Sequence, residues 1–210
     1  MLNSYAFLPR IRPFRYGMVL LCASLLGGCF LADQDDSDPI IPEAALAYPM
    51  KTGPARQCTE SSDGEQTCSR ALLEKRLSGG YSLTVWSKSE DGTEEESSPK
   101  QYRVRKLAGA GVPDGAYLVQ AIDDSADSRF LGLLKLRADR GWEQLEPQCD
   151  QLLATRFAEF VTQGWIFTKP DATLKDPTCY VSRDGLDDAR LFTILDSPAK
   201  SSTTVLYTRK

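Results

Sequence analysis

The sequence predicts an α+β domain: an antiparallel sheet of about five to seven strands, with two or three packed helices and disulfide bracing. From residue 81 onward, short segments alternate apolar and polar residues and are separated by turns rich in Gly, Asp and Pro. Such alternation is typical of antiparallel strands. Other segments carry apolar residues at helical spacing. Blocks of strands with separate helices indicate the α+β class.

The strands are predicted from these alternating segments. In residues 81–88, Tyr81, Leu83 and Val85 alternate with more polar neighbours. Residues 130–136 are apolar on both faces, which predicts a central strand whose second face is covered. The remaining predicted strands are 101–107, 116–123, 142–147, 165–168, 178–182 and 203–209.

Three segments are predicted as helices. Residues 69–80 (SRALLEKRLSGG) end in two glycines, which stop a helix. Residues 149–164 carry an apolar stripe and end at a glycine, so this segment is expected to cover the sheet. Residues 184–195 are expected to turn three apolar side chains inward. The stripe of the second helix is Leu153, Phe157, Phe160 and Val161, and the inward residues of the third are Leu191, Ile194 and Leu195.

The N-terminus has the organisation of an export signal. Arg10, Arg12 and Arg15 form a basic region, and residues 18–28 follow as an apolar stretch of 11 residues. A membrane-spanning helix needs about 20 apolar residues, so this length favours a cleaved signal peptide over residues 1–28. An uncleaved anchor and plain secretion are the two alternatives.

Residues 26–29 (LGGC) resemble the lipobox of bacterial lipoproteins, in which an aliphatic residue and two small residues precede a cysteine. The resemblance implies that Cys29 becomes the first residue of the mature protein and carries fatty acyl chains such as palmitate. Several acyl chains anchor a protein stably, whereas one does not. Phe30, instead of an aspartate, implies the outer membrane, with the domain in the periplasm.

The chain after Cys29 is expected to divide into two parts. Residues 29–54 combine four aspartates with four prolines and lack periodic apolar residues, which is typical of an extended, solvated tether. The globular domain is then expected over residues 55–210.

Four cysteines in the exported domain, Cys58, Cys68, Cys149 and Cys179, predict two disulfides. Three pairings are open. We favour Cys58 with Cys68, because an Asp-Gly turn between them would bring them together, and Cys149 with Cys179. The wide spacings and the absence of C-x-x-C argue against zinc, so no metal and no other cofactor is expected.

Composition excludes several functions. The 25 basic residues include the three arginines of the signal segment, so its removal leaves 22 basic and 29 acidic residues. This negative charge disfavours nucleic acid as a partner. The chain contains no histidine, which excludes a Ser-His-Asp triad and histidine-based metal sites. Two S-x-x-K matches, at 97–100 and 197–200, contain prolines where penicillin-recognising enzymes have a helix.

A carboxylate pair is the catalytic alternative. Such a pair, as in cell-wall glycosidases, must lie about 5 to 9.5 Å apart across a cleft. Glu143 and Glu146 point to opposite faces of a strand, and Asp187 and Asp188 are adjacent on the last helix. An envelope hydrolase therefore requires a convergent pair that the sequence does not identify.

The tryptophans are the main candidates for recognition. Trp86, Trp142 and Trp165 could stack on peptidoglycan sugars or anchor an envelope protein, or could instead belong to the core. Burial of Trp86 beyond 90% would exclude it as an exposed platform. The sequence thus predicts a non-enzymatic outer-membrane lipoprotein. It is held to the membrane by its N-terminal lipid and has a binding or scaffolding role.

Overall fold

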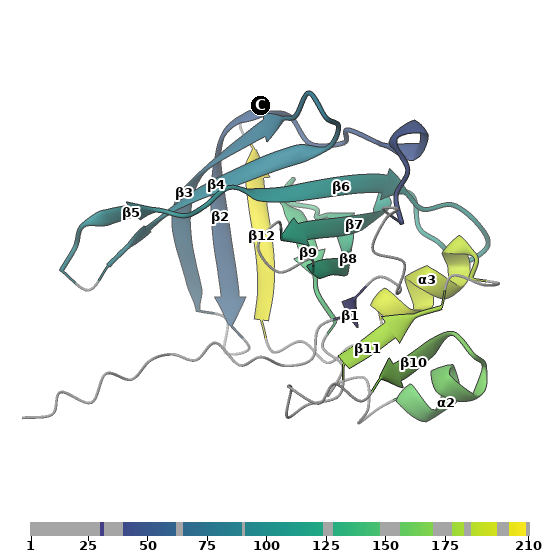
Figure 1. Cartoon of the computed structure of the whole chain (residues 1–210). Helices are drawn as coiled ribbons and strands as arrows, with labels where there is room; N and C mark the ends of the chain where they lie inside the picture. Colours follow the sequence, from purple (N-terminus) through teal and green to yellow (C-terminus); the bar gives the residue numbers. More distant parts are fainter. Residues whose placement is uncertain are drawn as a thin grey trace, which may run out of the picture.

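The structure is a computed structural model of the chain (Figure 1). It describes residues 30–31, 40–61, 65–89, 91–123, 128–147, 156–169, 178–182, 186–196 and 202–208. The predicted signal peptide and Cys29 lie outside these residues.

Eight antiparallel strands form a closed barrel in which successive strands along the chain are neighbours (Figure 1). The barrel strands are β2 (Gly53–Ser61), β3 (Gln66–Lys75), β4 (Tyr81–Lys88), β6 (Lys100–Lys106), β7 (Ala116–Asp123), β8 (Ser128–Leu136), β9 (Trp142–Leu145) and β12 (Ser202–Thr208). The last of these strands, β12, pairs with the first, β2, and with β9. Because β9 also pairs with β8, the ring is complete.

The predicted α+β class is therefore wrong, and the domain is mostly β. A sheet that closes on itself buries one complete face without any helix. The described residues hold only short helices: the 3₁₀ turn η1 (Glu43–Ala45), α2 (Phe157–Thr162) and α3 (Asp188–Leu195). None of the helices in the described part of the chain is long and apolar enough to cross a bilayer.

The helix predicted over 69–80 is also wrong, because this segment forms most of β3 and the turn after it. Ala71 and Leu73 face the barrel interior at alternate positions, which is strand periodicity. Ala71 is paired with Ala55 on one side and Val85 on the other. These neighbouring strands override the helical propensity of the segment.

Several strands lie outside the barrel ring. A short ribbon consisting of β1 (Phe30–Leu31), β11 (Thr178–Val181) and β10 (Ile166–Lys169) extends from β8. On another side, β5 (Glu94–Glu96) pairs with the end of β4 and forms an arm that projects from the barrel (Figure 1).

The described residues form two apolar clusters, one on each side of the barrel wall. The interior core lies inside the barrel, and the outer core lies between the outer face of β7–β9 and the layer of α2, α3, β10 and β11. The interior core comprises Met50, Ala55, Ala71, Leu73, Tyr81, Leu83, Tyr102, Val104, Val119, Leu134, Trp142 and Leu206. The outer core comprises Ile41, Leu107, Ala116, Leu118, Leu131, Leu133, Leu145, Phe160, Ile166, Cys179, Val181, Leu191, Ile194 and Leu195.

The outer core confirms that β8 is covered on its second face. Leu133 belongs to the outer core and the next residue, Leu134, to the interior core. Leu191, Ile194 and Leu195 of α3 are buried, as predicted. In α2, Phe160 is buried but Val161 is 41% exposed, because a helix of six residues offers only a narrow inward face. Leu153 lies outside the described residues.

Residues 40–50, which the sequence places in the tether, pack against the barrel. Ile41 is fully buried in the outer core, and its carbonyl oxygen accepts a hydrogen bond from Arg103. The amide of Ala47 donates to the carbonyl oxygen of Val104. Met50 enters the interior core. The folded part of the chain therefore begins before residue 55.

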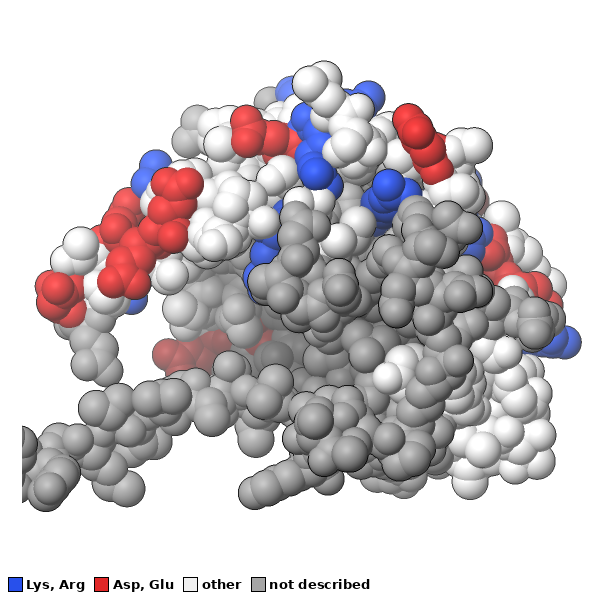
Figure 2. All heavy atoms as spheres, viewed as in Figure 1, with Lys and Arg blue, Asp and Glu red and all other residues white. Residues whose placement is uncertain are grey.

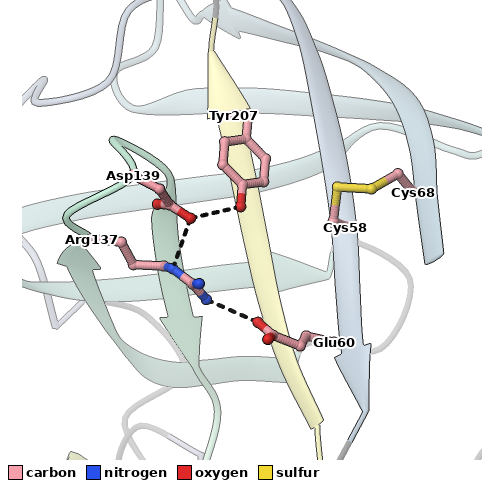
Figure 3. The surroundings of a disulfide bond; sticks show 6 residues. All are labelled: Cys58, Glu60, Cys68, Arg137, Asp139 and Tyr207. Atoms are coloured by element: carbon pink, nitrogen blue, oxygen red, sulfur yellow. Dashed lines mark hydrogen bonds and ion pairs between the residues drawn. A yellow bond between two sulfur atoms is a disulfide. The ribbon is translucent and has the colours of Figure 1, made fainter. Parts of the chain in front are cut away.

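The disulfide Cys58–Cys68 is confirmed, and it joins directly opposite residues of β2 and β3 (Figure 3). Cys179 is also disulfide-bonded. Cys149 lies outside the described residues, so the Cys149–Cys179 pair stays a prediction.

A polar network links β2 and β12, the first and last strands of the barrel, to the turn between β8 and β9 (Figure 3). Arg137 contacts Glu60 at 2.9 Å and Asp139 at 3.3 Å, and the Tyr207 hydroxyl donates to Asp139 at 2.9 Å. The amide of Gly141, then the Tyr207 hydroxyl and Arg137, lower the pKa of Asp139. The network thus ties the β8–β9 turn to β2 across β12.

Candidate binding cavity in the barrel

The barrel interior contains a partly enclosed cavity. Its volume, measured as the space that the centre of a water molecule can occupy, is about 20 Å³. This exceeds the roughly 10–15 Å³ that one water needs. Eight-stranded barrels either fill their interior with side chains or hold one small ligand, and this barrel leaves a small space. The residues that line it are Met50, Gln57, Leu73, Leu83, Tyr102, Val119, Leu134, Trp142, Gln144, Thr204 and Leu206.

Strand alternation puts these side chains into the interior. On β9, Trp142 and Gln144 line the cavity while Leu145 belongs to the outer core. On β7, Val119 faces inward and Leu118 outward. Gly132 allows the wall to close tightly here, because a Cβ at this position would lie 2.8 Å from the carbonyl oxygen of Leu145.

One end of the cavity is closed by the segment that precedes β2. The Tyr81 hydroxyl donates to the carbonyl oxygen of Met50 and accepts from the Met50 amide, both at 3.0 Å. The Tyr48 hydroxyl accepts from the Gly80 amide at 3.2 Å. Gly80, with φ of +81°, also lets the backbone pass close to β6, since a Cβ there would lie 2.2 Å from the carbonyl oxygen of Tyr102.

The polar side chains of the cavity lie on three adjacent strands. Gln57 on β2 pairs with Leu206 of β12, and Thr204 of β12 pairs with Gln144 of β9. Gln57, Gln144 and Thr204 are half-buried, whereas most of the apolar lining is buried. Two amides and one hydroxyl therefore form the more exposed side of the cavity wall.

The interior also holds two tyrosines whose ionisation is suppressed. Burial raises the pKa of Tyr81 to about 12. Burial first, and then the carboxylate of Glu146, raise the pKa of Tyr102. Both phenols are neutral at physiological pH and act as apolar surface with a polar tip.

The predicted recognition tryptophans have different surroundings. Trp142 is only 8% exposed and lies in the barrel interior, so it is not a surface platform. Trp86 is half-buried on the outer face of the arm, with the Arg70 guanidinium 4.3 Å from its ring centre. Trp165 is half-buried and stacks on Phe160.

The barrel cavity is not predicted from the sequence, although Trp142 and Gln144 alternate as two residues on one face of a strand do.

The carboxylates considered for catalysis do not form a pair in a cleft. Asp187 caps α3 by accepting from the Arg190 amide, and Asp188 binds Arg105 at 2.7 Å. Glu143 lies on β9, whereas Glu146 follows Leu145, the last residue of that strand. Among the S-x-x-K residues, the Ser97 hydroxyl accepts from the Val85 amide and pins the arm to β4.

The tip of the acidic arm is a turn held by hydrogen bonds to one of its carboxylates. The Asp91 carboxylate accepts from the Ser89 hydroxyl at 2.5 Å and from the Thr93 amide at 2.9 Å. These bonds lower its pKa to about 2. Acidic residues are visible along the arm (Figure 2), and Glu94 pairs with Arg70 at 2.9 Å. Charged residues on an exposed edge strand oppose unwanted strand pairing.

Metal binding finds no support in the residues that the structure describes, where no three His, Cys, Asp or Glu side chains gather. Comparisons with protein families, curated proteins and solved structures gave no match. The class that the fold and cavity define is therefore an antiparallel up-and-down barrel with a small, uncharged interior cavity.

Proposed function

We propose that the protein is an outer-membrane lipoprotein, anchored through Cys29 with its domain in the periplasm, and that its role is binding and not catalysis. The observation that carries the binding role is the barrel cavity, with its apolar lining and its three polar side chains. The anchor rests on the resemblance of residues 26–29 to a lipobox.

The binding role is favoured over the envelope hydrolase by the chemistry of the side chains. The chain has no histidine. The pKa is lowered for the carboxyl groups of Asp91, Asp139 and Glu159. A general acid of a glycosidase needs a raised pKa. An envelope protein or peptidoglycan as a partner of the outer surface remains compatible with this role.

The start of the fold has a consequence for anchoring. Phe30 and Leu31 form β1, which pairs with β11 and β8. Acyl chains on Cys29 would begin one residue before this strand, about 3.8 Å away from Cα to Cα. The domain would then lie against the bilayer at its β1 side instead of hanging from a long tether.

The anchor is tested by intact mass spectrometry and membrane fractionation of the protein from a diderm host. The expected result is acylation of a chain that begins at Cys29, with the protein in the outer-membrane fraction. Cys29→Ser should abolish both, whereas Cys22→Ser, in the segment that is removed, should change neither. An unmodified N-terminus or a freely soluble protein would contradict the anchor.

A further inference from the structure

We propose that the outer face of strands β2–β5 docks against the same face of a second copy of the chain, in a two-fold symmetric pair. This inference goes beyond the proposed function and uses neither the barrel cavity nor the lipid anchor. It rests on one row of side chains whose charges complement the same row in reverse order.

The row crosses four neighbouring strands. Arg56 of β2 lies directly opposite Arg70 of β3, and Arg70 lies opposite Trp86 of β4. Trp86 in turn lies opposite Glu96 of β5. Directly opposite residues of antiparallel strands point to the same face, and neighbouring strands are about 4.8 Å apart. The four side chains therefore form an evenly spaced row with two cations at one end and a carboxylate at the other.

The row lies outside the barrel and is accessible. Ala55, the neighbour of Arg56, faces the interior, so alternation turns Arg56 and the rest of the row outward. Both arginines and Glu96 are exposed, and Trp86 is half-buried. The end of the row at Glu96 lies on the arm that projects from the barrel (Figure 1). Strand β3 lies across the ring from β8, the strand that carries β1, so an anchor that precedes β1 leaves this face open.

The charges at the two ends of the row form no ion pair within the described part of the chain. Arg70 pairs with Glu94 at 2.9 Å, whereas no described residue forms an ion pair with Arg56 or Glu96. The Arg56 guanidinium lies 5.8 Å from the ring centre of Tyr207, a contact that holds it against the sheet. Like charges directly opposite on neighbouring strands, such as the two arginines, destabilise a sheet. A carboxylate from outside the chain would relieve this repulsion.

A two-fold axis parallel to the strands supplies that carboxylate. It reverses the order of the strands in the facing copy, so Arg56 of each copy meets Glu96 of the other. At the centre of the row, Arg70 of each copy meets Trp86 of the other and forms a cation–π contact. Every contact therefore occurs twice, as an isologous interface requires. A two-fold axis across the strands would instead place Arg56 against Arg56, which repulsion between like charges disfavours.

The test is sedimentation velocity of the chain 29–210 with Cys29→Ser, which contains every described residue and carries no lipid. Two charge reversals at the ends of the row are compared with this parent. Arg56→Glu gives a row with acids at both ends, and Glu96→Arg gives a row with cations at both ends. Each variant should therefore repel its own copies, whereas the two variants complement each other.

The parent should show a weak, reversible monomer–dimer equilibrium that shifts toward the monomer as salt is added. Each single variant should dimerise about thirtyfold more weakly, because two exposed ion pairs become two repulsions. An equimolar mixture of the two variants should recover the parent's affinity. Glu95→Arg is the matched control. Glu95 lies opposite Ser87 on the other face of the arm, so the same change of charge there should leave the dimer intact.

A parent that stays monomeric at every concentration, or one whose association does not respond to salt, would overturn the proposal without any variant. Single variants that dimerise as tightly as the parent would also overturn it. So would a mixture that stays monomeric although both variants unfold at the temperature of the parent. A monomeric parent that binds poly-glutamate through Arg56 would assign the face to an acidic partner instead of a second copy.

Discussion

The two apolar cores share one barrel wall but differ in content. The outer core consists almost entirely of aliphatic side chains and Phe160. The interior core includes Tyr81, Tyr102 and Trp142 and borders the cavity. On β8, Leu133 and Leu134 are neighbours in sequence yet belong to different cores. Burial alone therefore does not distinguish the two faces of the wall: the outer core is closely packed, and the interior retains a small space.

The largest effect is expected from truncation in the outer core. Leu133→Ala should lower the free energy of unfolding by about 3–5 kcal/mol, because it removes close contacts on all sides of a fully buried side chain. Leu134→Ala should cost about 2–3 kcal/mol, because Leu134 borders existing space and has fewer contacts to lose. Urea denaturation of both variants measures the difference. An equal or larger loss for Leu134→Ala would contradict a cavity at this position.

Substitution of two glycines with the same backbone φ angle tests the close packing at the closed end of the barrel. Gly80 and Gly111 both have φ of +81°, but only at Gly80 would a Cβ meet backbone atoms. Gly111→Ala should cost about 1 kcal/mol for the left-handed conformation alone, and Gly80→Ala about 2–4 kcal/mol. Thermal unfolding compares the two variants. Similar losses would mean that the close approach to Tyr102 is not required.

Alkaline pH should weaken the interior core selectively. The pKa of Tyr81 is raised to about 12 from an ordinary value of 10. The stability from its neutral form is complete below pH 10, and it decreases by about 1.4 kcal/mol per pH unit as the pH rises from 10 to 12. Tyr81→Phe should be less stable at pH 8 but should depend less on pH in this range. An unchanged pH dependence in this variant would rule out Tyr81 as the titrating group.

The smallest effect concerns a polar side chain outside the barrel. Gln120 is fully buried on the outer side of β7, and neither its side-chain oxygen nor its nitrogen has a hydrogen-bond partner. Gln120→Leu should therefore stabilise the domain by about 1 kcal/mol. Gln101→Leu is the control, since Gln101 accepts a hydrogen bond from Arg76 and its loss should destabilise. Destabilisation by Gln120→Leu would contradict the contrast.

Local patterns in the sequence identify strands better than they identify closure. The strand predicted at 81–88 matches β4, and the one at 116–123 matches β7. The Asp-Gly turn also indicates the Cys58–Cys68 pair correctly. Closure depends instead on β12 pairing with β2, which lies more than 140 residues earlier. No local signal carries that pairing, and so the fold class was wrong.

The same limit applies to the cavity. Trp142 and Gln144 alternate correctly for one face of a strand, but only a closed barrel turns that face into an interior. The period of segment 69–80 was misread as helical, because Leu72 lies beside the inward Leu73 and both are apolar. Its strand form depends on pairing with both β2 and β4. Nor could the sequence show that Met50 enters the barrel.

Intact mass spectrometry of the protein purified from its own membranes shows whether the barrel is anchored by lipid. We expect a chain that starts at Cys29 and carries covalent acyl groups. An unacylated N-terminus would rule out the anchor.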